Sequence, residues 1–456
     1  MAIYTRRVWG WMFFDWASQP YLTLLLTFIF GPYFAEIVAA DLVANGASPA
    51  AAGARAQALW GWGLTAAGLA IAVLAPILGA VADRSGRRMV WIAGFSALYI
   101  AGAAALWWAV PEAPPVGLVL VAFGIGFIGM EFATIFSNAL LPGLGARPEL
   151  GRISGAGWAF GYVGGVVALI LMLAAFADNA EGRTLLGAAP ALGLDGATRE
   201  GTRFVGPFTA LWFALFMIPF FLWVRDDPLP AGRARVGLGE TLRDLGRTLR
   251  ALPRHRSRFA FLLASLFYRD GLNGMFTFGG IYALGVLGWE VAQIGVFGIL
   301  AAITGAVFAW LGGFADDRFG PKPVIVACIA ALLLAACAVV AITETSVFGI
   351  AVTPGSALPT VAFYVAGCLI GAAGGALQSA SRTMMVRQAD PDRMTEGFGL
   401  YALSGKATTW LAPLLIAIVT AATDSQRLGI APLILLFLLG LVLLIWVKPD
   451  GDRTSR

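Results

Sequence analysis

The sequence predicts an all-α membrane protein with twelve transmembrane helices in two pseudo-symmetric halves of six. The 456 residues are 59% hydrophobic and 12% charged, whereas about 25% of the residues of a soluble domain are charged. A glycine-and-charge signature also occurs twice, as Gly79-Ala-Val-Ala-Asp-Arg-Ser-Gly-Arg-Arg88 and Gly313-Phe-Ala-Asp-Asp-Arg-Phe-Gly-Pro-Lys322. Its two copies are 234 residues apart, about half the chain, which indicates a duplicated helical bundle.

Each predicted span is an apolar stretch of about 20 residues or more, which is enough to cross a bilayer. A polar linker at 225–257 separates the first half, 1–224, from the second half, 258–456. The spans of the first half are 9–38, 58–82, 89–110, 116–142, 152–177 and 204–224. Those of the second half are 258–287, 290–315, 323–343, 358–384, 397–422 and 428–447.

Basic residues predict the orientation of these spans. If both termini are cytoplasmic, 24 of the 31 lysines and arginines fall on the cytoplasmic side and five on the outer side, as the positive-inside rule requires. The net charge of +5 is spread over short loops, so it does not suggest a nucleic-acid partner. We therefore expect a multi-pass protein of a bacterial inner membrane, monomeric, with lipid as its surroundings.

The linker contains a pattern typical of an amphipathic helix. Its leucines are spaced four, three, four and three residues apart, with arginines between them: Leu238, Leu242, Leu245, Leu249 and Leu252. Such a helix is expected to lie on the inner membrane face with its arginines near anionic headgroups. A solvated linker helix without a membrane contact is the alternative.

The repeated signature is expected to form a gate on the cytoplasmic side. Its glycines allow helices to approach closely, and Asp83 or Asp317 can accept hydrogen bonds from the N-terminus of a neighbouring helix. Such contacts can form in one transport state and break in the other. The predicted gating residues are Asp83, Arg84, Arg88, Asp317, Arg318 and Lys322. The alternative is that these charges only fix the topology.

Ionisable residues inside spans mark the candidate substrate site, because each costs several kcal/mol in hydrocarbon. They are Asp15, Glu131, Arg269, Asp270 and Lys406, with Gln19, Asn138, Asn273, Gln378 and Arg382 as polar companions. We predict that a substrate binds Arg269, Asn273, Lys406, Asn138, Gln378 and Gln19. Asp15, Glu131 and Asp270 are predicted to act as counter-ions or proton carriers, since burial raises the pKa of a carboxyl group.

The alternative is structural. Arg269 with Asp15, or Lys406 with Glu131, would then form static ion pairs that hold the halves together. Both interpretations place groups of opposite charge near the middle of the membrane.

Three motifs resemble those of one family of transporters. Phe14-Asp-Trp-Ala-Ser-Gln-Pro-Tyr21 is similar to a first-helix motif, Asp-Trp-Ala-Asn-Ser-x-Tyr, although Gln19-Pro20 replaces its serine and small residue. Phe136-Ser-Asn-Ala-Leu-Leu-Pro142 resembles its Tyr-Asn-Ala-x-Leu-Pro segment, and Tyr268-Arg-Asp-Gly-Leu-Asn273 begins a segment similar to its seventh-helix motif. The family is the vacuole-effluxer-like (autophagy-related 22-like) branch of the major facilitator superfamily. The resemblance implies the major facilitator fold and transport, and fungal members suggest amino-acid efflux.

The expected function is secondary active transport of a small polar or zwitterionic solute, an amino acid or related metabolite, by alternating access. Coupling to protons is the expected energy source, and efflux of an amphiphilic, lipid-like or cationic compound is the alternative. An enzyme would need a nucleophile, a metal cluster or an acid–base pair near an interface. The chain has one histidine, in the linker, and three cysteines within apolar stretches. No cofactor or metal is therefore expected.

Overall fold

The computed structural model of the chain describes residues 3–179, 181–226, 238–289, 291–353 and 355–452. Its first half contains α1 (Arg6–Pro20), the π-helix η1 (Tyr21–Phe28), α2 (Phe30–Ala44), α3 (Pro49–Ser85), α4 (Arg88–Ala105), α5 (Val116–Asn138), α6 (Leu150–Ala175), α7 (Glu200–Arg203), α8 (Val205–Phe216) and α9 (Ile218–Trp223). The linker helix is α10 (Leu238–Ala251). The second half contains α11 (Arg256–Leu287), α12 (Val291–Phe319), α13 (Pro321–Ala341), β1 (Ser346–Val347), β2 (Ile350–Ala351), α14 (Leu358–Gln388), α15 (Met394–Lys406), α16 (Leu411–Thr423), α17 (Gln426–Gly429) and α18 (Pro432–Leu443).

Eleven helical stretches of the described residues are long and apolar enough to cross a membrane, against the twelve predicted. The remaining predicted span, 258–287, forms α11, which has 32 residues and therefore the length to cross. Polar residues near its middle, Arg269, Asp270 and Asn273, lower its hydropathy. The prediction of an all-α membrane protein is confirmed.

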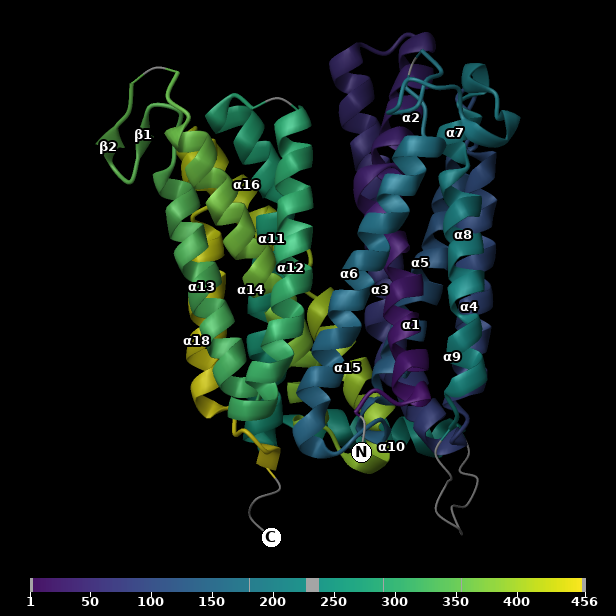
Figure 1. Cartoon of the computed structure of the whole chain (residues 1–456). Coiled ribbons are helices and arrows are strands. Elements are labelled where there is room, and N and C mark those ends of the chain that lie inside the picture. The colour runs from purple at the N-terminus through teal and green to yellow at the C-terminus, as the bar shows by residue number, and fades with distance from the viewer. Residues whose placement is uncertain (1–2, 180, 227–237, 290, 354, 453–456) are drawn as a thin grey trace.

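The helices form two bundles that stand side by side, α1–α9 in one and α11–α18 in the other (Figure 1). The two bundles meet along two seams: α6 packs against α12 and α14, and α3 packs against α15. The two seams are equivalent, because α3 of the first half corresponds to α12 of the second and α6 corresponds to α15. A duplicated structure has such paired contacts.

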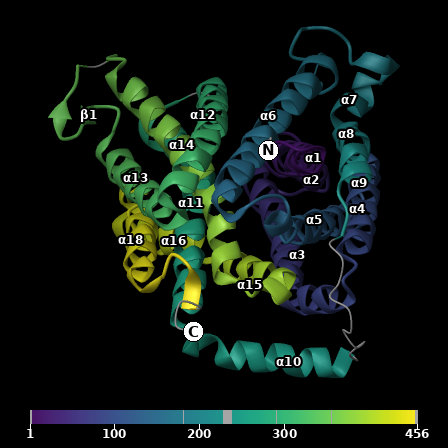
Figure 2. The same ribbon diagram turned by 60° about the horizontal axis from the view of Figure 1, so that its bottom comes forward.

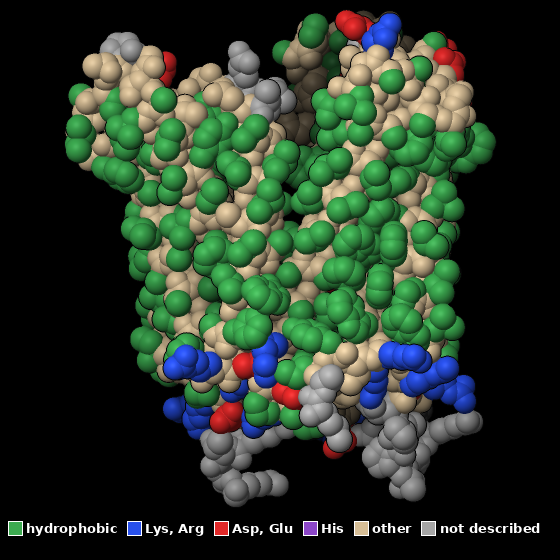
Figure 3. Space-filling view, viewed as in Figure 1, with side chains coloured by type: hydrophobic (Ala, Val, Ile, Leu, Met, Phe, Trp, Pro, Cys, Tyr) green, Lys and Arg blue, Asp and Glu red, His purple; other side chains and the backbone are tan. Residues whose placement is uncertain are grey.

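The bundles touch at one end and separate towards the other (Figures 1 and 3). We call the closed end, which carries α10 and the last residues of α3 and α12, the linker end, and the opposite end the open end. On the face shown in Figure 3, lysines and arginines gather at the linker end, while a hydrophobic band crosses the middle of the molecule. The band is the surface that a bilayer covers.

The glycines that begin the two signature copies lie at these seams. A Cβ atom at Gly79 would be 2.6 Å from the carbonyl oxygen of Thr395, and one at Gly313 would be 2.7 Å from that of Gly151. No side chain fits at either position, so glycine lets backbone meet backbone across the halves.

The predicted linker helix is present as α10. Figure 2 shows α10 crossing the linker end beneath α15, and Leu245 is 4% exposed there. Leu245 is therefore covered by protein, whereas Leu249 is exposed. Asp244 forms an ion pair with Arg84 at the end of α3. The side chains of Leu238 and Leu242, and linker residues 227–237, lie outside the described residues.

Candidate functional site

Two ion pairs, one buried and one partly buried, connect the two halves. In the first, Arg382 of α14 donates two hydrogen bonds to Asp15 of α1, over 3.0 and 3.2 Å. Arg382 is 3% exposed and Asp15 is 9% exposed. The guanidinium also lies 4.9 Å from the ring of Trp11 and 5.2 Å from that of Trp158, an aromatic cage that favours a desolvated cation.

The second pair joins Glu131 of α5 to Lys406 at the end of α15. The Lys406 Nζ atom lies 2.7 Å from Oε1 of Glu131 and 4.8 Å from the ring of Phe127. Both charged side chains are 18% exposed, so this pair retains some contact with its surroundings. The predicted alternative pairing of Lys406 with Glu131 is therefore present in this structure.

The other predicted pairing, of Arg269 with Asp15, is wrong for this structure. Arg269 of α11 donates a hydrogen bond of 3.0 Å to the carbonyl oxygen of Tyr401, and its guanidinium lies 4.4 Å from the Tyr401 ring. The neighbouring Asp270 accepts a 2.8 Å hydrogen bond from the backbone N–H of Ala412. These two consecutive charged residues therefore contact different helices: Arg269 contacts α15 and Asp270 contacts α16.

The predicted amide residues divide into two groups. Gln19 lies one turn beyond Asp15 on α1, and Gln378 lies one turn before Arg382 on α14. Since α1 leaves the linker end and α14 approaches it, both amides flank the first ion pair on its side towards the open end (Figure 1). Asn273 is exposed on α11, one turn from Arg269, whereas Asn138 is the last residue of α5, about two turns from Glu131.

The sequence identified Arg382 only as a polar companion of the candidate site and gave it no partner. The predicted tenth span ends at 384, which places this arginine near the membrane surface among the basic residues that set the topology. In the structure α14 continues to Gln388, so Arg382 lies almost two turns inside the helix. The pairing with Asp15 depends on helix rotation and tilt, which a single sequence does not reveal.

At the linker end, Asp83 forms the first of two latches between the halves. It accepts hydrogen bonds from the backbone N–H groups of Thr395, over 3.1 Å, and Glu396, over 2.8 Å, in the first turn of α15. Arg88 donates to the same carboxylate over 2.8 Å and to the Thr395 hydroxyl over 2.9 Å. A carboxylate from the first half thus caps a helix of the second.

Asp317 forms the second latch in the opposite direction. It accepts a 3.2 Å hydrogen bond from the backbone N–H of Arg152 in the first turn of α6, and it forms an ion pair with the Arg152 side chain. The adjacent Asp316 is 1% exposed and accepts from Thr383 within its own half. Of these two adjacent carboxylates, Asp317 is therefore the one that contacts the other half, as the sequence predicts.

Three predicted gating residues make other contacts in this structure. Arg84 pairs with Asp244 of the linker helix. Arg318 lies 5.2 Å from the ring of Phe319, and Lys322 donates a 2.7 Å hydrogen bond to the carbonyl oxygen of Val447 in the second half. Of the predicted gating residues, Asp83, Arg88 and Asp317 are thus the ones that contact the other half directly.

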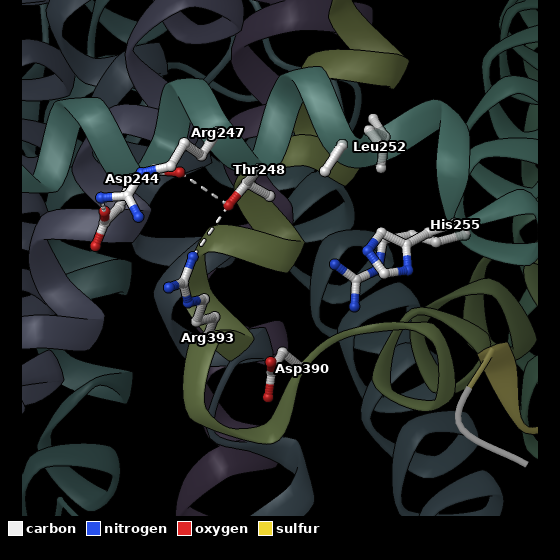
Figure 4. Close-up of a pocket in the computed structure, with 9 residues that line it drawn as sticks. Asp244, Arg247, Thr248, Leu252, His255, Asp390 and Arg393 are labelled. Carbon is white, nitrogen blue, oxygen red and sulfur yellow. Dashed lines mark hydrogen bonds and ion pairs between the residues drawn. The ribbon is translucent and has the colours of Figure 1, made fainter. Parts of the chain in front are cut away.

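The linker helix also contacts both halves. Asp244 faces Arg84 of the first half, and one turn further Thr248 accepts a 3.0 Å hydrogen bond from Arg393 at the start of the second half's α15. Figure 4 shows Thr248, Arg393 and Asp390 around a cavity of about 360 Å³ between these elements. Although burial opposes its charged form, the hydrogen bond from Arg84 and the nearby Arg247 hold the pKa of the Asp244 carboxyl below its usual range.

The chain has two facing helical bundles, which pack against each other through glycine-rich helices and are connected by ion pairs in the interior. This arrangement defines the class: the chain has the major facilitator fold of secondary transporters. The human organic anion transporter MFSD10 aligns with 96% of this chain and 99% of its own, with a TM-score of 0.72 and 16% identity. The proton:xylose symporter XylE gives a TM-score of 0.67 at 13% identity, over 96% and 94% of the two chains.

The chain belongs to the family described as vacuole effluxer Atg22 like, whose model matches residues 64–455. The protein of Bacillus subtilis (strain 168) named uncharacterized MFS-type transporter YxiO is 26% identical over 455 residues, which cover 100% of this chain and 97% of that protein. Autophagy-related protein 22 of Coccidioides immitis (strain RS) is 25% identical over 284 residues, 57% of this chain and 44% of that protein. The predicted family is confirmed, and the protein is a membrane transporter, not an enzyme.

Proposed function

We propose that this transporter carries a small zwitterionic solute, an amino acid or a related metabolite, by alternating access. The observation that carries the proposal is the presence of the Asp15–Arg382 and Glu131–Lys406 ion pairs between the halves. A zwitterion can enter such a pair by exchange: its carboxylate binds the cation and its ammonium binds the carboxylate. No buried charge then loses its partner, a loss that would cost several kcal/mol.

The amides around the first pair support the same class of solute. Gln19 and Gln378 lie on its side towards the open end, and an amide offers both hydrogen-bond donors and acceptors. We propose that Asn138 on α5 and Asn273 on α11 add further polar groups along the path of the solute. A lipid-like substrate would gain little from these groups, because desolvating them without new hydrogen bonds is unfavourable.

Proton coupling is proposed through Glu131 and Asp15. Protonation of either carboxylate removes one partner from its ion pair and frees Lys406 or Arg382 for a substrate carboxylate. Of the two, Glu131 is the more exposed, which makes it the more accessible to protons. Protonation of Glu131, which releases Lys406 from the ion pair, would therefore link proton movement to solute binding.

We further propose that the linker end faces the cytoplasm of a bacterial cell. Lysines and arginines gather at this end (Figure 3), in agreement with the positive-inside rule, and both described ends of the chain lie there (Figure 1). The structure then corresponds to a state with a closed cytoplasmic gate.

The test begins with the melting temperature of the purified protein against panels of amino acids, sugars, organic anions and amphiphilic cations. An amino acid that raises it is then followed as a radiolabelled solute in proteoliposomes with an imposed pH gradient. We expect Glu131→Gln and Asp15→Asn to abolish accumulation against a gradient, while Glu112→Gln, at an exposed position, leaves it unchanged. Stabilisation by amphiphiles alone, or unchanged pH dependence in both variants, would contradict the proposal.

A further inference from the structure

The eleventh predicted span is interrupted in the structure. α15 ends at Lys406, residues 407–410 form turns, and α16 begins at Leu411. Helix ends leave backbone N–H and C=O groups without intrahelical partners, which is costly within a membrane. Residues 407–410 are Ala-Thr-Thr-Trp, and Pro413 follows four residues after Thr409. Because proline has no backbone N–H and its ring crowds the carbonyl four residues earlier, it prevents a continuous helix here.

Arg269 of α11 occupies the end of α15. Besides its hydrogen bond to the carbonyl oxygen of Tyr401, its guanidinium lies directly against the last turn, where a Cβ atom at Gly405 would be 2.3 Å from Nη1. Gly405 is therefore required for this approach. A cation at this position is stabilised by the negative end of the helix dipole.

Asp270 occupies the start of α16. It is 3% exposed, and its Oδ2 accepts the N–H of Ala412 in the first turn of that helix. An anion at a helix N-terminus is stabilised by the positive end of the dipole. Two consecutive residues of α11 thus place a positive charge at one side of the interruption and a negative charge at the other.

The two segments of this span pack against different partners. α15 packs mainly against α3 of the first half, where Asp83 caps its first turn. α16 packs against α17, α18 and α11 of its own half. The interruption therefore separates a segment attached to the opposite half from a segment fixed in the second half.

Two polar atoms at the interruption lack hydrogen bonds. Oδ1 of Asp270 and Oγ1 of Thr408 are both buried, and neither has a partner among the described residues. Unsatisfied buried polar groups are uncommon in native structures, and each one calls for an explanation. A hydroxyl and a carboxylate oxygen are complementary as donor and acceptor.

We propose that residues 407–410 are a hinge on which α15 swings relative to the second half when the linker end opens. Arg269 and Asp270 are its positioning residues, which assigns them to the hinge instead of to the solute or the proton. In the swung state Thr408 donates to the free oxygen of Asp270. This inference rests on the proposed alternating access, in which the two latches must release.

The first experiment measures movement by double electron–electron resonance in nanodiscs, with the three native cysteines replaced. Spin labels at Pro391 and Trp446 both report on the second half, whereas labels at Arg6 and Trp446 report on the separation of the halves. In the latch variant Asp83→Asn, we expect the labels at positions 6 and 446 to show an additional, longer distance. We expect the distance between the labels at 391 and 446 to shift by about 5 to 10 Å, as a tilt of some 20° at the hinge would produce. A control pair at Phe319 and Trp446 should stay unchanged.

The hinge is overturned if the halves separate while the 391–446 distance stays single, because α15 then moves rigidly with its half. If the halves do not separate in Asp83→Asn, the proposed role of the Asp83 latch is wrong. The hinge is then tested by hydrogen exchange of the peptide spanning 407–414. There we expect at least tenfold faster exchange in Asp270→Ala but near-native exchange in Asp270→Asn, whose amide oxygen still accepts from Ala412. Equal exchange in Asp270→Ala and the native protein would also overturn the hinge.

Discussion

The Asp83 latch gives the sharpest prediction about how the protein moves. Its carboxylate accepts three hydrogen bonds, two from the backbone of α15 and one from Arg88, and a hydrogen bond to a charged group contributes about 1.5 to 3 kcal/mol. Asn at this position keeps one acceptor oxygen but turns an amide NH₂ group towards the second N–H. We expect Asp83→Asn to reduce the preference for the closed linker end by about 2 to 3 kcal/mol, which is a roughly 30- to 150-fold change in the conformational equilibrium.

The assay is the distance distribution between spin labels at Arg6 and Trp446, compared between the native protein and Asp83→Asn. We expect a minor longer distance to become the major population, and Asp317→Asn to act in the same direction because it weakens the equivalent latch on α6. Glu112→Gln, at an exposed position remote from both latches, should change nothing. If Asp83→Asn shows the native distribution while the protein stays folded, the hydrogen bonds across the seam do not control the gate.

Further predictions concern stability and pH. Removal of one member of the Glu131–Lys406 pair leaves an unpaired charge, so Lys406→Met should lower the unfolding free energy by about 3 kcal/mol and Glu131→Gln in the same protein should restore most of it, as measured by thermal melting. Gly102→Ala should destabilise by about 1 to 3 kcal/mol because its Cβ would lie 2.4 Å from a backbone nitrogen of α5, whereas Gly94→Ala on the same helix, with open space around it, should be tolerated. The lowered pKa of Asp244 means that its contact with α3 is retained above the ordinary carboxyl pKa of 3.8 and is lost as pH falls through the lower folded value; hydrogen exchange of α10 should show this, and Asp244→Asn should weaken the contact at every pH.

The architecture and the latches could be predicted from the sequence because each has a local, repeated signal. Hydropathy defines the spans, and the spacing of Asp83 and Asp317 at half the chain identifies equivalent turns. Their capping of neighbouring helices follows from the chemistry of a carboxylate near a helix N-terminus. The structure adds that each cap crosses to the other half.

The pairing of charges in the interior could not be predicted in the same way. Asp15 and Arg382 are 367 residues apart, and their contact depends on the rotation of two helices that the sequence does not fix. The interruption after Lys406 does have a local signal in Pro413, which the prediction of one continuous span, 397–422, did not use. The sequence does not reveal that Asp270, a residue of another helix, caps the start of α16.

The two latches are reciprocal, and this has a consequence for how such a chain could be assembled. Each half supplies a carboxylate that caps a helix start of the other half. Two copies of one half that face each other would satisfy both contacts, which is the self-complementary contact of a twofold dimer. Duplication of such a subunit, with α10 as the added connection, would produce the arrangement of the present chain.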